Sequence, residues 1–114
     1  MKTPPSKVKI GTQTFQIVLR SRHEDGMLND GTFGYTLDTE NLIVIDSNLA
    51  QGKQRTTVFH EILHAVRMVF DTSIKPKKSD DFEAWEHYFI GIYEEGVLLV
   101  LNNNPDLLAY FTED

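Results

Sequence analysis

The pentapeptide His60-Glu61-Ile62-Leu63-His64 constrains the fold more than any other part of the chain. Its two histidines are four residues apart, and an α-helix brings residues at that spacing onto one face, one turn above the other. On a helix both imidazoles can reach a single metal ion, and Glu61 is then placed to accept a proton from a water molecule beside that ion. The pentapeptide therefore predicts a helix and half of a zinc site.

The flanking sequence supports this helix and predicts two more. From Gln51 to Phe70 apolar residues recur at helical spacing, and no proline or glycine follows Gly52. A second long helix is predicted from Asp81 to about Leu101, because the run of asparagines before Pro105 ends the pattern. Pro105 suits the first position of a short final helix through Phe111.

Before these helices the apolar pattern has the period of β-strands. In residues 8–19 apolar and polar residues alternate on both sides of Gly11, which predicts a β-hairpin. Two further strands are predicted at residues 33–37 and 42–45. We expect these strands to form a small meander. Strands followed by helices predict an α+β fold, in which a short antiparallel or mixed sheet packs on the pentapeptide helix and on the second long helix.

Length and composition limit the organisation and the partners. The 114 residues, 40% of them hydrophobic, suit a single domain, which we place at residues 8–114 after a flexible leader of residues 1–7. No apolar run approaches the roughly 20 residues that cross a membrane and no signal segment is visible, so we expect no membrane contact and a cytoplasmic location. The net charge of −6 argues against a nucleic-acid partner. Because the chain lacks cysteine, His, Asp or Glu must hold any metal.

A catalytic zinc site needs a third protein ligand, which we expect from the second long helix. On a helical wheel with Phe82 at 0°, the apolar residues of this helix cluster around zero and Glu86 falls at about 40°. A carboxylate on an apolar face needs a metal or a charge partner. Glu86 is therefore the predicted third ligand.

Three alternatives to Glu86 as a metal ligand stay open. Glu83 is the second choice and ranks below Glu86 because its position has an explanation without a metal: with Asp80 as N-cap, it stands where a glutamate reaches back to the helix start. His87 is the third choice. The explanation without a metal is a buried salt bridge from Glu86 to Arg55 or Arg67.

Three segments carry a resemblance to a known family: Gly34-Tyr35 leading to residues 42–47, residues 54–65 around the pentapeptide, and residues 104–107 after the second long helix. Over residues 8–107 the chain resembles the small phage-encoded branch of the ImmA/IrrE-like metallopeptidases. The resemblance implies a zincin-like fold of the minimal gluzincin type. It also implies Zn²⁺ held by His60, His64 and a helical glutamate, with Glu61 as the catalytic base. For a phage-encoded hydrolase the location would be the host cytoplasm.

These features favour a zinc-dependent metallopeptidase, an endopeptidase that hydrolyses a peptide bond of a protein or peptide substrate. We expect the substrate backbone to add to an exposed edge strand, formed by residues 42–45 or 33–37. A transition-state donor is also expected, and the candidates are Tyr35, Tyr88, Tyr93 and His87. The alternative is a non-enzymatic zinc-binding or protein-interaction protein on the same fold. The small size of the chain and the hydrophobic tail of residues 107–111 favour this alternative. The sequence specifies neither the substrate nor the oligomeric state.

Overall fold

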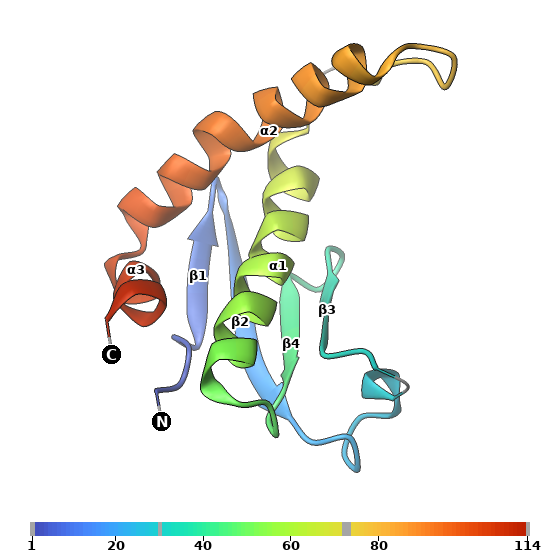
Figure 1. Ribbon diagram of the computed structural model, residues 1–114. Helices are drawn as coiled ribbons and strands as arrows, with labels where there is room; N and C mark the ends of the chain where they lie inside the picture. Colours follow the sequence, from blue (N-terminus) through green and yellow to red (C-terminus); the bar gives the residue numbers. More distant parts are fainter. Residues whose placement is uncertain (1, 30, 72–73, 114) are drawn as a thin grey trace.

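The computed structural model describes residues 2–29, 31–71 and 74–113. Residues 1, 30, 72, 73 and 114, which belong to the predicted leader, to loops and to the end of the predicted domain, lie outside the described residues. Four strands are followed by three α-helices, with a short 3₁₀-helix at Gly26–Leu28 (Figure 1). The fold is α+β with a four-stranded mixed sheet, in agreement with the predicted class.

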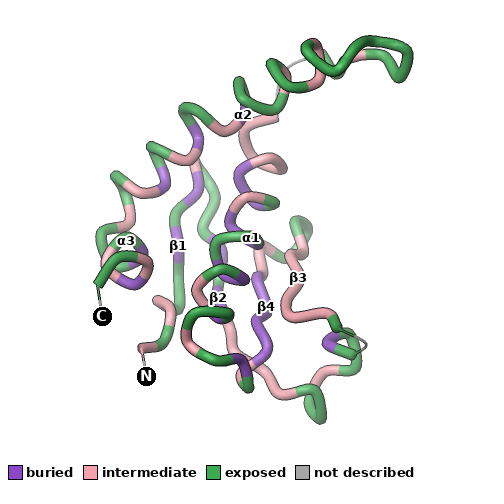
Figure 2. The backbone as a smooth tube through the Cα atoms, in the orientation of Figure 1, coloured by how far each residue is buried: buried purple, intermediate pink, exposed green. Residues whose placement is uncertain are grey.

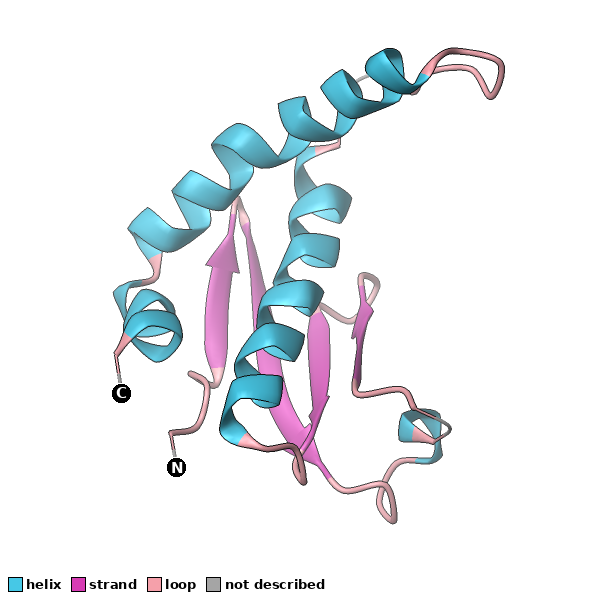
Figure 3. Ribbon diagram, viewed as in Figure 1, coloured by secondary structure: helices cyan, strands magenta, loops and turns pink. Residues whose placement is uncertain are grey.

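The predicted strands and helices are all present, as Figure 3 shows. α2 begins one residue later than predicted, because Asp81 rather than Asp80 is the N-cap and accepts a hydrogen bond from the Ala84 N–H at 3.0 Å. The pentapeptide helix, α1, has the predicted bounds. The strands are β1 (Lys7–Ile10), β2 (Gln13–Arg20), β3 (Gly34–Leu37) and β4 (Leu42–Asp46), and the helices are α1 (Gln51–Phe70), α2 (Phe82–Asn103) and α3 (Pro105–Thr112).

The strand order in the sheet is β1-β2-β4-β3. β1 and β2 form the predicted antiparallel hairpin, but β4 pairs parallel with β2, so the predicted meander is wrong. The physical reason lies in β4, where Ile43, Val44 and Ile45 are all fully buried. A continuously apolar strand is most stable inside the sheet, and β3 is left at the edge. Of the two predicted edge segments, residues 33–37 therefore contain an edge strand and residues 42–45 do not.

α1 packs along one face of the sheet and carries the core on its inner side (Figure 2). Its residues Val58, Ile62, Ala65 and Val66 are buried in the same cluster as the apolar side chains of β1, β2 and β4. The opposite side of α1 is exposed. Because α1 packs on the sheet through its buried side, the residues on its exposed side are held in a fixed position relative to the sheet.

α2 crosses α1 at a close contact made by Gly96. A Cβ atom there would lie 2.7 Å from Val66 Cγ1 and 3.0 Å from Phe70 Cδ2. The buried positions of α2 are Ile92, Gly96 and Val100. The first turns of α2 extend past the end of α1 (Figure 1), and Figure 2 shows them largely exposed.

We predict that Gly96→Ala lowers the free energy of unfolding by about 1–2 kcal/mol, because the added methyl group crowds Val66 and Phe70. Gly91→Ala is the matched control in the same helix, since a Cβ there meets no atom within 4 Å. It should raise the free energy of unfolding by up to about 1 kcal/mol through helix propensity. Urea unfolding checks both changes. An equal increase in the free energy of unfolding in both variants would show that the contact between α1 and α2 at Gly96 is not crowded.

Both ends of the described chain contact the helices. The Lys2 N–H donates to Gln51 Oε1 at 2.9 Å, and Lys2 Nζ donates to the Ala109 carbonyl at 3.4 Å. The described part of the predicted flexible leader is thus attached to the domain. In α3, Tyr110 is buried and its hydroxyl donates to Gln54 Oε1 at 2.8 Å. The hydrophobic tail therefore contributes to the core.

Over the described ranges, no helix has both the length and the apolar content needed to cross a membrane.

Candidate metal centre

α1 brings His60, Glu61 and His64 together. Among the described His, Asp and Glu side chains, these three form the group whose potential ligand atoms all lie within 4.8 Å of one another. The Nε2 atoms of His60 and His64 are 3.2 Å apart, and both side chains are exposed. Two imidazole nitrogens bound to one tetrahedral zinc at about 2.0–2.1 Å would be separated by about 3.4 Å. The histidine pair therefore has a spacing suited to two ligands of one ion.

The Glu61 side chain points inward from the same turn of α1. Glu61 is only 5% exposed, and its Oε2 lies 3.9 Å from His60 Nε2. Its other oxygen, Oε1, accepts a hydrogen bond of 2.8 Å from the hydroxyl of Thr36. A buried carboxylate is costly unless it is hydrogen-bonded, and this bond both offsets that cost and orients the group.

Sequence reasoning missed Thr36. It lies on edge strand β3, and successive residues of a strand face opposite sides of the sheet. Because Thr36 faces α1, its neighbour Tyr35 faces away from the histidines. The strand pattern was visible in the sequence, but the pairing that brings β3 beside Glu61 was not.

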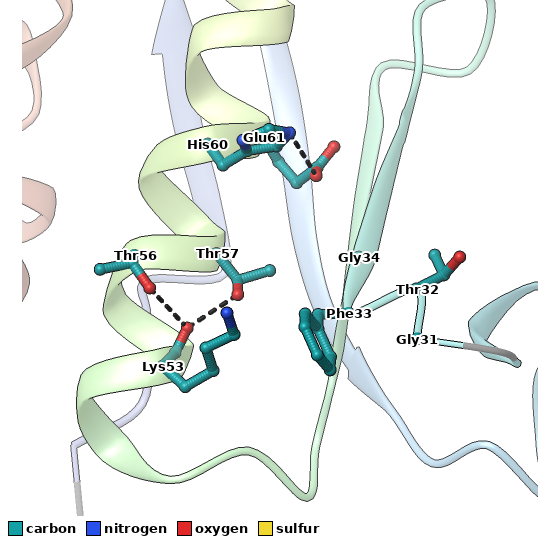
Figure 4. A pocket seen from close by; sticks show the side chains of 9 residues that line it. All are labelled: Gly31, Thr32, Phe33, Gly34, Lys53, Thr56, Thr57, His60 and Glu61. Atoms are coloured by element: carbon teal, nitrogen blue, oxygen red, sulfur yellow. Dashed lines mark hydrogen bonds and ion pairs between the residues drawn. The ribbon is translucent and has the colours of Figure 1, made fainter.

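A cleft of about 450 Å³ opens between α1 and the start of β3, with His60 and Glu61 at one end (Figure 4). Residues 31–34 form one wall. The other wall is α1, which contributes Lys53, Thr56, Thr57, His60 and Glu61. Gly34 allows the two walls to approach, because a Cβ there would lie 2.8 Å from the Val44 carbonyl oxygen and 3.1 Å from Thr57 Cγ2.

The structure does not bring Glu86 or Glu83 to the histidines. Both are exposed in the first turns of α2, and neither belongs to the group formed by His60, Glu61 and His64. The prediction that Glu86 lies on a buried apolar face is wrong. That prediction was centred on Phe82, which is 78% exposed, because this part of α2 extends beyond the core.

The predicted transition-state donors lie outside the cleft. Tyr35 donates its hydroxyl hydrogen to Asp25, and burial, followed by this hydrogen bond, raises the pKa of Tyr35. Tyr88 donates to Asp71 Oδ2 at 2.6 Å, a bond that raises the pKa of Tyr88. Both hydroxyls therefore donate to carboxylates away from the histidines and are not directed at the proposed metal site.

The other two candidate donors also have different surroundings. His87 Nε2 lies 3.6 Å from Glu83 Oε1 on the exposed surface of α2, and Tyr93 is a partly buried residue packed against the core. Among the described residues that line the cleft, Lys53 is the side chain with a permanent positive charge. Lys53 could not be recognised from the sequence, because a lysine on an exposed helix face has no distinctive signal.

No protein-family model, curated protein or solved structure matches the chain. The resemblance to the ImmA/IrrE-like metallopeptidases therefore remains an interpretation of its motifs.

Proposed function

We propose that this protein is a zinc-dependent peptidase with a zincin-like arrangement of its α+β fold. One observation carries the proposal: two imidazole nitrogens lie 3.2 Å apart beside a buried, oriented carboxylate at the end of a cleft. The helix spacing of the pentapeptide and the chemistry of its donors suit Zn²⁺.

When bound, zinc would polarise the scissile carbonyl and increase the acidity of water. His60 and His64 would hold it through Nε2. Glu61 would act as the general base, and its two oxygens have different roles in this proposal. Oε1 accepts the Thr36 hydrogen, whereas Oε2 faces His60 Nε2 and is free to accept a proton from the attacking water.

Edge strand β3 supports a peptide as the substrate class. Among the described strands, β3 has β4 on one side and no strand on the other, and the cleft lies between α1 and the start of β3. An extended peptide can add to such an edge through backbone hydrogen bonds.

For the third ligand we propose Glu86, with Glu83 as the alternative, because a third ligand is expected from the downstream helix. The apolar-face argument that ranked Glu86 above Glu83 does not hold, since both side chains are exposed. Glu83 has a neighbour in His87, at 3.6 Å. Glu86 is exposed, so no buried contact would be lost if it turned toward a metal. Completion of the site by Glu86 would require the first turns of α2 to approach His60 and His64.

Thr36→Val should lower the rate of peptide cleavage by about 10- to 100-fold, because Glu61 loses the hydrogen bond that orients it. Zinc content should stay the same. Thr36→Ser keeps the hydroxyl and should recover most of the rate. Cleavage is measured with a labelled peptide mixture. A rate for Thr36→Val equal to that of the parent would contradict the positioning role of Thr36.

A metal-binding protein without catalysis is the second candidate function. It is favoured by the observation that the described residues assemble two histidines and Glu61, but no further ligand, at this point of α1. Elemental analysis of the purified protein tests the metal site that both candidates share. We expect about one zinc per chain after dialysis, and a metal content close to zero would contradict both.

A further inference from the structure

Lys53 lies in the same cleft as the proposed catalytic residues. It precedes His60 by seven residues, so the two side chains project from the same face of α1, about 10 Å apart along the helix axis. Both line the cleft. Figure 4 shows Lys53 and Phe33 at the end of the cleft opposite to His60 and Glu61.

The ammonium group of Lys53 is held in place but not neutralised. Its Nζ lies 4.5 Å from the centroid of the Phe33 ring, whose face attracts a cation. Within the described ranges, no carboxylate forms an ion pair with it. This contrasts with the net charge of −6 of the whole chain. A cation kept accessible in the cleft of an acidic protein favours an anionic ligand at that point.

The neighbouring polar groups do not replace Lys53 as a donor. The hydroxyls of Thr56 and Thr57 both donate to the Lys53 backbone carbonyl, at 3.1 and 2.7 Å. Figure 4 shows both bonds. Their hydrogens are therefore already used, and among these three described residues the Lys53 side chain is the donor left for a ligand.

The position of Lys53 determines which residue of a bound peptide it would contact. An extended chain rises about 3.3 Å per residue, so about 10 Å corresponds to about three residues. Thr36, in β3, is bonded to Glu61, and Phe33, which contacts Lys53, directly precedes β3 in the sequence. A peptide that pairs antiparallel with β3, the more common pairing, runs from Thr36 toward Phe33. Its C-terminal portion then passes Lys53.

We propose that Lys53 selects a carboxylate of the substrate, about three residues to the C-terminal side of the cleaved bond. This inference rests on the proposed peptidase function for the register, but the binding of the carboxylate does not depend on cleavage. The carboxylate is an acidic side chain or the free C-terminus of the peptide, because both present the same group to an ammonium.

The test is peptide binding to the Glu61→Gln variant, which should cleave substrate too slowly to disturb a binding measurement. The probes are fluorescein-labelled ten-residue peptides with Asp, Asn or Lys at each position in turn, each made with a free and an amidated C-terminus. Fluorescence anisotropy gives the affinities. In the otherwise unchanged variant we expect an Asp or a free C-terminus to improve affinity over its neutral counterpart by about three- to tenfold.

Lys53→Met, added to Glu61→Gln, should abolish this preference, and Lys53→Glu should shift it toward Lys. Lys75→Met is the matched control, because Lys75 also lies over an aromatic ring, that of Trp85, but outside the cleft. It should leave the preference intact.

If the preference for a carboxylate survives amidation of the peptide C-terminus, Lys53 binds an acidic side chain. If amidation removes the preference, Lys53 binds the free C-terminus. Equal affinities for charged and neutral peptides, no binding of either, or a preference unchanged by Lys53→Met would contradict the proposal. A Lys53-dependent preference without any cleavage by the parent protein would instead contradict the peptidase function alone.

Discussion

Replacing Glu61 with glutamine is expected to reduce peptide cleavage by about 10²- to 10⁴-fold while zinc remains bound. Glutamine has nearly the shape of glutamate, and its amide oxygen can still accept the hydrogen bond from Thr36. It cannot accept a proton from water at neutral pH. The substitution therefore removes the general base and preserves the two histidines.

Two further measurements make the Glu61→Gln result specific. The melting temperature should change little, since the side chain stays buried and hydrogen-bonded. Glu94→Gln, on the exposed surface of α2, is the control and should cleave at the parental rate. If Glu61→Gln also cleaved at that rate with its zinc in place, Glu61 would not be the base.

His60→Ala and His64→Ala should each weaken zinc binding by more than about 100-fold. Loss of a hydrogen-bond partner behind a ligand already costs about 10- to 100-fold, and loss of the ligand itself should cost more. The two variants should be similarly impaired, because the two Nε2 atoms lie 3.2 Å apart and would be equivalent ligands of one ion. Competition with a chromophoric chelator gives the affinities. His23→Ala, an exposed histidine outside the cluster, should bind zinc as the parent does.

The same titration tests the third ligand. Glu86→Gln should weaken zinc binding by at least about tenfold if Glu86 completes the site, whereas Glu83→Gln should do so if the alternative is right. Unchanged affinity in both would show that neither glutamate binds the metal.

The sequence predicted those features that depend on local periodicity. Alternation around Gly11 predicted the β1–β2 hairpin, and helical spacing predicted the bounds of α1. The meeting of His60, Glu61 and His64 followed from the same helix, because four residues make about one turn. These features needed no knowledge of how distant segments pair.

Features that depend on distant pairing were missed. Parallel pairing of β4 with β2 moved β3 to the edge and brought Thr36 to Glu61, although 25 residues separate the two. Glu86 was misplaced for a related reason. A helical wheel assumes that the whole helix is covered, but the first turns of α2 extend beyond the sheet and α1.

Cleavage of a quenched fluorescent peptide mixture, before and after removal of metal, tests the central claim most directly. The metal-binding peptidase that we propose should cleave the mixture, lose this activity in a strong chelator, and regain it with about one equivalent of zinc per chain. Absence of cleavage by the zinc-loaded protein, or cleavage that persists in the metal-free protein, would contradict the account.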